Sequence, residues 1–208
     1  SSNLKGEPFV PTTGQQWEAG LRYQQGRSIY VTLGGYQITQ QNLVTPDPAG
    51  TLCGTSVCSV QTGEGRIRGV ELEGKASLPW GTALIATVTR SEGEVTKSNV
   101  AGQVGKKLPQ VPDWMASLFV NHTIEQGPMS GFGFGGGVRY VGESFGDTNN
   151  TLEIPDYALF DLFIRYDLGD ALPSLANTTF SVNARNVADK RFVATCTGTA
   201  ACYYGQGR

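Results

Sequence analysis

About eight segments of this sequence alternate apolar and polar side chains with a period of two. Several of them run 12 or more residues, longer than the roughly five or six residues of a common strand. In the segment 157–168, one face carries only apolar or aromatic side chains, from Ala158 to Leu168, whereas the other includes Asp161 and Arg165. Successive side chains of a β-strand point to opposite faces, so this period indicates strands with one apolar face. The sequence therefore predicts an all-β fold.

The connections between these segments alternate strictly between short and long. The short ones lie near 25–26, 79–81, 126–130 and 169–177. The long ones lie near 42–62, 97–111, 146–156 and 195–207. An outer-membrane barrel has brief periplasmic turns and extended surface loops. This alternation predicts a transmembrane antiparallel up-and-down β-barrel of the bacterial outer membrane.

Four cysteines form two close pairs, and both pairs fall in long connections rich in Gly, Ser, Thr and Ala. Cys53 lies near Cys58, and Cys196 lies near Cys202. A metal site would want Cys-x-x-Cys spacing or histidine partners, yet the single histidine, His122, lies within a strand-like segment. We therefore predict two small disulfide-closed loops, an oxidising compartment and no metal site.

The charge pattern excludes some partners and the hydropathy pattern excludes a helical membrane span. The net charge is −2 and no Lys/Arg block occurs, which argues against a nucleic-acid partner. No apolar run of about 18 residues is present, so no transmembrane helix is expected. The amino-terminal residues lack the features of a signal peptide, and a start without Met fits a processed protein or a fragment.

Within such a barrel, the charged faces of the segments would point to the lumen. The side chains expected there are Glu71, Glu73, Lys75, Arg139, Glu143, Asp161, Arg165 and Arg185. Arg66 and Arg68 would face solvent or lipid headgroups, and His122 is expected to fill space at the membrane interface. The glycines between Gly131 and Gly137 alternate with phenylalanine, which is typical of a bent barrel strand rather than a phosphate-binding loop.

Four stretches resemble the C-terminal barrel of TonB-dependent siderophore receptors. They are TGQQWEAGLRYQ, QTGEGRIRGVELEGKASLPWG, GFGGGVRYVGESFGDTNNTLEIPDYALFDLFIRYDL, and VNARNVADKRFVATC with CYYG following. The segment Asn186–Phe192 resembles the family's penultimate-strand motif N-L-x-D-K-x-Y, with Val187 and Phe192 as departures. The Cys–loop–Cys–aromatic–Gly ending resembles receptors for hydroxamates of the ferrichrome and ferrioxamine type.

This resemblance implies that residues 1–208 are the C-terminal portion of a barrel of roughly 22 strands. About the last third of the barrel would be present, without its final strand and without the N-terminal plug. The implied function is an outer-membrane receptor and active transporter for ferric siderophores, energised by the TonB system through the plug. It implies no enzyme activity and no cofactor, because iron is carried as the siderophore complex. The other implied partners are outer-membrane lipid and lipopolysaccharide.

The resemblance also implies where the ligand binds. Tyr203 and Tyr204, which follow Cys202, resemble the aromatic pair that lines the binding cup of hydroxamate receptors. The Cys196–Cys202 disulfide would hold them in place. A hydroxamate is favoured, and a catecholate stays open. The alternatives are a passive porin, an adhesive surface barrel, a small independent eight-stranded barrel and a secreted β-sandwich.

Overall fold

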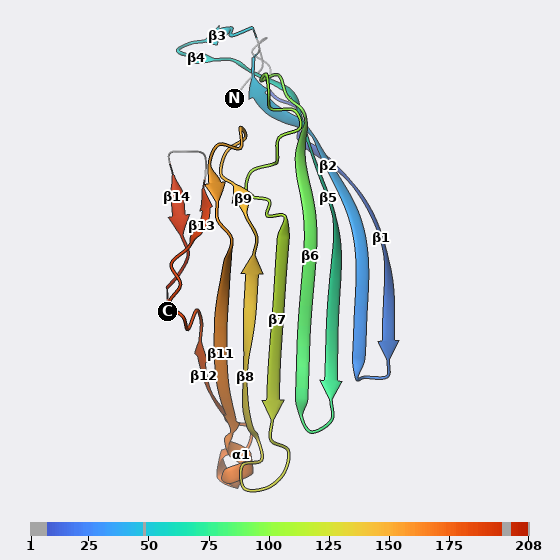
Figure 1. Ribbon diagram of the computed structural model, residues 1–208, viewed down its shortest axis with the longest axis vertical. Helices are drawn as coiled ribbons and strands as arrows, with labels where there is room; N and C mark the ends of the chain where they lie inside the picture. The colour runs from blue at the N-terminus through green and yellow to red at the C-terminus, as the bar shows by residue number, and fades with distance from the viewer. Residues whose placement is uncertain (1–7, 48, 197–200, 208) are drawn as a thin grey trace.

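The computed structural model describes residues 8–47, 49–196 and 201–207, and its main element is one antiparallel sheet (Figure 1). The eight strands of this sheet are, in spatial order, β1 (Thr13–Gln25), β2 (Ile29–Pro46), β5 (Ser59–Leu78), β6 (Thr82–Lys97), β7 (Trp114–Thr123), β8 (Phe132–Val141), β11 (Tyr157–Asp167) and β12 (Thr179–Ala184). Each pairs with its neighbour in this order, which confirms the all-β, up-and-down antiparallel prediction.

Three small hairpins occupy the long connections at one end of the sheet (Figure 1). They are β3 (Leu52–Cys53) with β4 (Ser56–Val57), β9 (Ser144–Phe145) with β10 (Glu153–Ile154), and β13 (Val193–Cys196) with β14 (Cys202–Tyr204). The helices α1 (Leu168–Ala171) and η1 (Pro173–Leu175) lie in a connection at the other end. Among the residues described, no helix is long and apolar enough to cross a membrane.

The short connections turn tightly because some of their residues adopt the left-handed backbone conformation. Gly26, between β1 and β2, has φ 56°, and Gly81, between β5 and β6, has φ 75°. Trp80 has φ 65° although it carries a side chain, and that side chain is 83% exposed. Positive φ at consecutive residues matches the twist of a hairpin. The end with the short connections is therefore compact.

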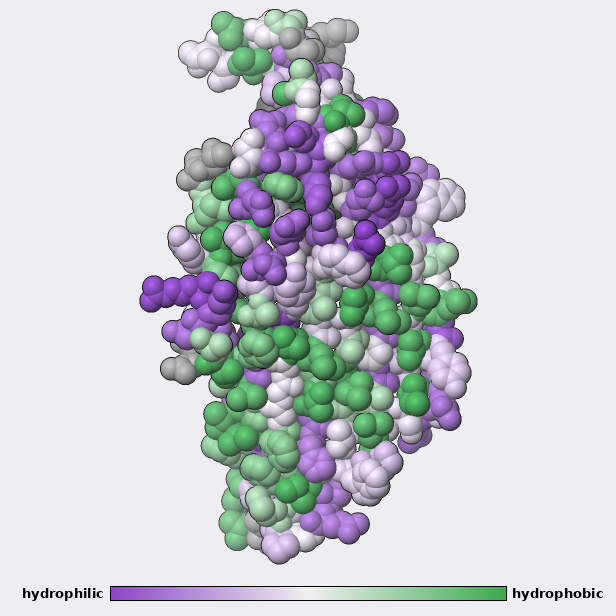
Figure 2. Space-filling view, viewed as in Figure 1, coloured by the Kyte–Doolittle hydropathy of each residue, from purple (hydrophilic) through white to green (hydrophobic). Residues whose placement is uncertain are grey.

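One face of the sheet, called the outer face below, is apolar across all eight strands except toward the end with the long connections. The register aligns Leu21 with Leu33, Leu33 with Leu72, and Leu72 with Val88. The same face carries Trp17, Val70, Leu118, Val120, Phe134, Phe160, Leu162, Ile164, Phe180 and Val182, all exposed. Figure 2 shows hydrophobic side chains over the middle and lower strands and hydrophilic ones at the end with the hairpins. Such a continuous exposed apolar surface suits contact with lipid.

The opposite face, called the inner face, carries the charges that the sequence assigned to a lumen. Within the strands, these are Glu71, Glu73, Lys75, Arg139, Asp161 and Arg165. Arg139 donates two hydrogen bonds to the Asp161 carboxylate, at 2.8 and 3.1 Å. Glu143 and Arg185 follow the last residues of β8 and β12, so strand alternation alone gives them no face.

Arg66 and Arg68 lie on the outer face, toward the end with the long connections. Arg68 pairs with Glu92 of β6 at 2.9 Å, and Arg66 pairs with Glu94 of the same strand. Both belong to the row of alternating residues that includes Val70. The structure thus places both arginines on the outer face and gives each a carboxylate partner.

The expected long connection 42–62 is mostly strand, which corrects the sequence analysis. β2 continues to Pro46 and β5 begins at Ser59, and these two residues are paired. The pairing shifts in register at Asn42, whose φ is 61°. Polar side chains dominate this extension, so it lacks the apolar alternation that marks a strand, although the backbone pairing continues.

The motif expected to be the penultimate strand, Asn186–Phe192, is also corrected, because it forms a turn. Asn186 has φ 48°, its Nδ2 donates to the Lys190 carbonyl, and its Oδ1 accepts from the Lys190 N–H, each at 2.9 Å. The asparagine side chain thus takes the place of a backbone partner, as in other Asn-based turns. β12 ends at Ala184, before the motif begins.

The glycine-rich strand β8 pairs without a bulge on both sides. Its inner-face glycines give space to large neighbouring side chains: a Cβ at Gly135 would meet the ring of Phe163, and one at Gly137 would meet the ring of Phe119. These two rings stack over the strand with centroids 5.5 Å apart. The glycines therefore allow close packing, a role that the sequence analysis did not foresee.

Candidate functional site

Three connections meet at the end of the sheet that carries the hairpins, and Gln110 joins them. Its backbone N–H donates to the Phe145 carbonyl at 2.8 Å, and its Nε2 donates to the Cys196 carbonyl at 2.8 Å. The connection from β6 to β7 is thereby bound both to β9 and to β13. We call this set the rim.

The β13–β14 hairpin of the rim contains one predicted disulfide, Cys196–Cys202, with an S–S distance of 2.05 Å. Cys196 is only 1% exposed. It fits closely against Gly146, where an added Cβ would lie 2.7 Å from the Cys196 Cβ. The disulfide thus links the two strands of the hairpin next to its loop, and Cys196 packs against the neighbouring connection. Residues 197–200 of the expected loop lie outside the described residues.

The two tyrosines predicted to bind ligand lie in β14 and are exposed. Tyr203 is 56% exposed and Tyr204 is 77% exposed, and they pair with Thr195 and Val193. Adjacent residues of an extended strand point to opposite sides. The structure therefore places both at the rim but does not bring them to one side of the hairpin.

The turn that follows β9 is organised by Asp147. Its carboxylate accepts hydrogen bonds from the N–H groups of Leu152 at 2.7 Å, Thr151 at 2.9 Å and Asn149 at 3.2 Å. The Leu152 N–H, followed by the Thr151 hydroxyl and N–H, holds the pKa of Asp147 below its ordinary value of 3.8. Asn150, in the same turn, bonds the N–H and the carbonyl of Lys107 at 2.8 and 2.9 Å.

Acidification is expected to loosen this turn. Because the pKa of Asp147 is lowered by folding, the stabilisation is complete above pH 3.8 and is lost as the pH falls through the lowered pKa. Hydrogen-exchange protection factors of the Thr151 and Leu152 amides should fall as the pH drops below about 4. Asp147→Asn should show weak protection already at about pH 5, with little further loss. Equal pH dependence in both proteins would contradict this assignment.

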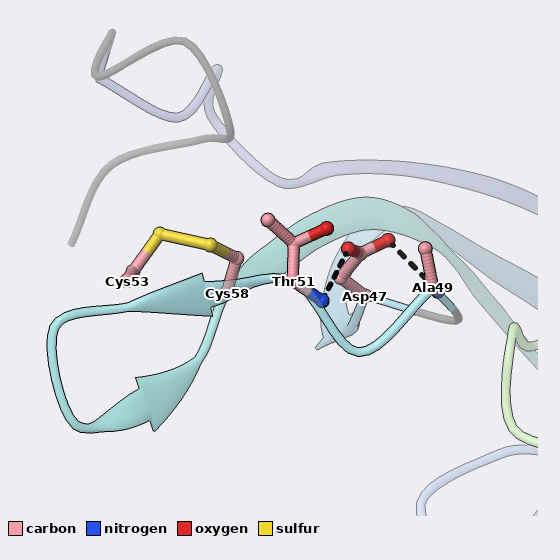
Figure 3. The surroundings of a disulfide bond; sticks show 5 residues. All are labelled: Asp47, Ala49, Thr51, Cys53 and Cys58. Carbon is pink, nitrogen blue, oxygen red and sulfur yellow. Dashed lines mark hydrogen bonds between the residues drawn. A yellow bond between two sulfur atoms is a disulfide. The ribbon is translucent and has the colours of Figure 1, made fainter.

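The second predicted disulfide, Cys53–Cys58, closes the β3–β4 hairpin with an S–S distance of 2.09 Å (Figure 3). Asp47, which is buried, accepts the N–H of Thr51 at 3.1 Å and of Ala49 at 3.3 Å. The Cys58 N–H donates to the Thr51 carbonyl at 2.7 Å. These hydrogen bonds fix the base from which the hairpin extends. Like the first disulfide, this one lies at the end of the sheet with the long connections.

A hollow of about 500 Å³ lies on the inner face beside Gln110. Tyr36, Glu18 and Glu71 contribute to its wall. Tyr36 extends across β5 because Gly69 has no side chain there: an added Cβ would lie 2.6 Å from the Tyr36 hydroxyl oxygen. Aromatic, amide and carboxylate groups together suit a ligand with both apolar and hydrogen-bonding parts.

Sequence analysis missed this hollow because its residues come from five segments far apart in the chain. Its wall depends on which residues of neighbouring strands are opposite each other, such as Tyr36 opposite Gly69. Alternation predicts the face of a side chain but not its cross-strand neighbour. Among the described residues, no group of three or more His, Cys, Asp or Glu could hold a metal ion.

Comparison with known proteins shows the same barrel along most of the chain. The family model described as "TonB dependent receptor-like, beta-barrel" matches residues 2–187. The ferrichrome outer membrane transporter/phage receptor of Escherichia coli (strain K12) is 36% identical over 204 residues, covering 98% of this chain and 26% of that protein. The ferrioxamine B receptor of Salmonella typhimurium (strain SL1344) is 32% identical over 208 residues, covering 98% and 28%. The chain thus spans about a quarter of the length of these relatives.

Solved structures agree with the sequence comparison. The ferric preacinetobactin receptor BauA from Acinetobacter baumannii has a TM-score of 0.82 at 25% identity, covering 100% of this chain and 31% of that chain. The ferric yersiniabactin uptake receptor FyuA from Yersinia pestis has a TM-score of 0.77 at 20% identity, covering 97% and 29%. The second match concerns the fold alone.

Proposed function

Since this chain belongs to the family of TonB-dependent receptor β-barrels, we propose that it is part of a receptor that carries ferric siderophores across the outer membrane with energy from the TonB system. Members of this family are receptors and transporters of the Gram-negative outer membrane, not enzymes. The observation that carries the proposal is the two-sided sheet, which is apolar on its outer face and charged on its inner face.

We propose further that residues 1–208 form the C-terminal portion of a larger barrel. In the described residues the sheet is open, with β1 and β12 at its edges rather than paired with each other. Open edges leave backbone groups unpaired, at several kcal/mol per group in lipid. Further strands of the same receptor would pair with these edges. This supports a larger barrel over a small independent one of eight strands.

The proposed cargo is a ferric siderophore of the hydroxamate class. Support comes from the two relatives named for ferrichrome and ferrioxamine B, which align with nearly the whole chain. Iron would enter as part of the cargo, so the proposal includes no resident cofactor. The inner-face charges would contact a plug inside the barrel, through which the TonB system acts, and outer-membrane lipid and lipopolysaccharide would surround the outer face.

Tyr203 and Tyr204 are the proposed ligand contacts at the rim. Both are exposed, the disulfide links the two strands of their hairpin, and Gln110 bonds this hairpin to the neighbouring connection. A phenol ring offers an apolar surface and a hydrogen-bonding group to a bulky siderophore. Because the two rings lie on opposite sides of β14, one of them should account for most of the contact.

Binding of a ferric trihydroxamate to the complete receptor, followed by intrinsic fluorescence quenching, tests both proposals. We expect saturable binding that one of the variants Tyr203→Ala and Tyr204→Ala weakens about tenfold, or about 1.4 kcal/mol, with a smaller effect of the other. Tyr23→Ala is the matched control, since Tyr23 is similarly exposed in the strand β1.

The outcomes separate the two proposals. Binding that neither tyrosine variant changes would exclude the tyrosines as contacts and leave the receptor function intact. Failure to bind any ferric siderophore would overturn the receptor function itself. In that case, single-channel conductance of the complete protein would test for a passive pore, which the family and its relatives do not favour.

A further inference from the structure

A groove of about 510 Å³ crosses the outer face on strands β7, β8, β11 and β12. Val120, Phe134, Leu162, Ile164 and Val182 form most of its wall. The wall is almost entirely apolar, and it is continuous with the rest of the outer face. The groove therefore offers an apolar ligand more contact than the flat surface around it does.

The groove exists because one cross-strand row contains two very small residues. The row runs Val120, Gly136, Leu162 and Ala184. On the side toward the short turns, the next row has Phe134 and other large side chains at the corresponding positions. An added Cβ at Gly136 would lie 2.7 Å from Leu162 Cδ2, so this leucine already leans over the glycine. The result is a depression between larger apolar side chains.

His122 is the only polar side chain among the described residues that line the groove. Its Nδ1 lies 2.9 Å from the Thr82 hydroxyl, and its ring is 5.5 Å from that of Phe134. Thr82 is the first residue of β6, directly after a short turn. His122 therefore lies at the end of the strands that carries the short turns. Because His122 contacts Thr82 through Nδ1, its other ring nitrogen, Nε2, is left for another partner.

We propose that this groove holds one acyl chain of a glycerophospholipid from the periplasmic leaflet, with the polar part of the lipid at His122. The proposal rests on the proposed function, because the short turns of an outer-membrane barrel face the periplasm. At that end, phospholipid surrounds an outer-membrane barrel. The apolar wall fits the chain, and the free ring nitrogen fits an ester or phosphate oxygen at the interface.

The test is retention of 1-palmitoyl-2-oleoyl-phosphatidylethanolamine by the complete receptor, measured by native mass spectrometry from detergent. The wild-type protein should retain one lipid. Gly136→Leu and Ala184→Leu fill the groove from two strands, and each should lower retention about tenfold, the effect of losing roughly two buried methylenes. Because the Gly136 position is crowded, the Gly136→Leu protein could fail to fold. In that case the Ala184→Leu protein, if folded, still tests the proposal.

Gly74→Leu is the matched control, since it adds the same side chain to the outer face where an added Cβ has open space. It should retain the lipid as the wild type does. Equal retention in the wild type and both filled variants would overturn the proposal. Equal loss in Gly74→Leu would overturn it too, because the lipid would then be merely annular. Ferric siderophore binding should be unchanged in all variants. A failure of the lipid proposal can therefore be distinguished from a failure of the proposed function.

Discussion

Gly135→Val should prevent most of the complete receptor from reaching a stable barrel. An added Cβ would overlap the carbonyl oxygen of Val120 and the ring of Phe163. The carbonyl belongs to the paired backbone of β7 and cannot move without breaking the sheet. Overpacking a well-packed site costs about 1–3 kcal/mol, and a clash with backbone belongs at or above the upper end of that range. Heat-modifiable migration on gels, with urea unfolding, measures the folded fraction.

The control for this prediction is Gly74→Val in β5. An added Cβ there meets nothing within 4 Å, so the same β-branched side chain should be tolerated. If both variants fold equally well, the close approach at Gly135 does not limit the fold. If both fail, strand glycines are needed for a reason other than space.

Asn186→Ala should lower the free energy of unfolding by roughly 3 kcal/mol, since it removes several buried hydrogen bonds at once. The Asn186 side chain bonds the Lys190 N–H, the Lys190 carbonyl and the Gln206 carbonyl at 2.9 to 3.2 Å. The residue is 2% exposed, so water does not replace these bonds. Its backbone N–H also donates to Asp161 at 2.9 Å, which ties the turn to β11.

Asn177→Ala is the control that separates the effect of the Asn186 hydrogen bonds from the effect of a positive φ. Asn177 also has a positive φ, 66°, but it is exposed in the connection before β12. Replacing Asn177 with alanine should lower the free energy of unfolding by only about 1 kcal/mol, which is the cost of the left-handed backbone conformation for alanine. Urea unfolding monitored by tryptophan fluorescence compares the two variants. Equal destabilisation would show that the Asn186 side chain contributes no more than its backbone angle.

The strands and their faces could be predicted because alternation is a property of each segment alone. The row that begins at Ala158 was assigned to the apolar side, and it lies on the outer face. The register between strands could not be predicted, because it depends on pairing across the sheet. The hollow at Tyr36 and the groove at Gly136 both depend on that register, so both were missed.

The other two incorrect predictions concern the turn at Asn186 and the extension of β2, where local side chains obscure the strand pattern. A family motif at Asn186 suggested a strand, but an asparagine that bonds its own neighbours makes a turn there. The extension of β2 to Pro46 was missed because its side chains do not alternate and its pairing shifts in register at Asn42. The disulfides were predicted correctly, because short cysteine spacing in a loop needs no long-range information.

The position of Gln110 has a consequence for how such receptors can diversify. Its two hydrogen bonds, to Phe145 and Cys196, couple the lengths and shapes of three surface loops. An insertion or deletion in one of them would move Gln110 or one of its two acceptors out of hydrogen-bond distance. A lineage that changes its ligand by altering these loops would therefore have to exchange them together.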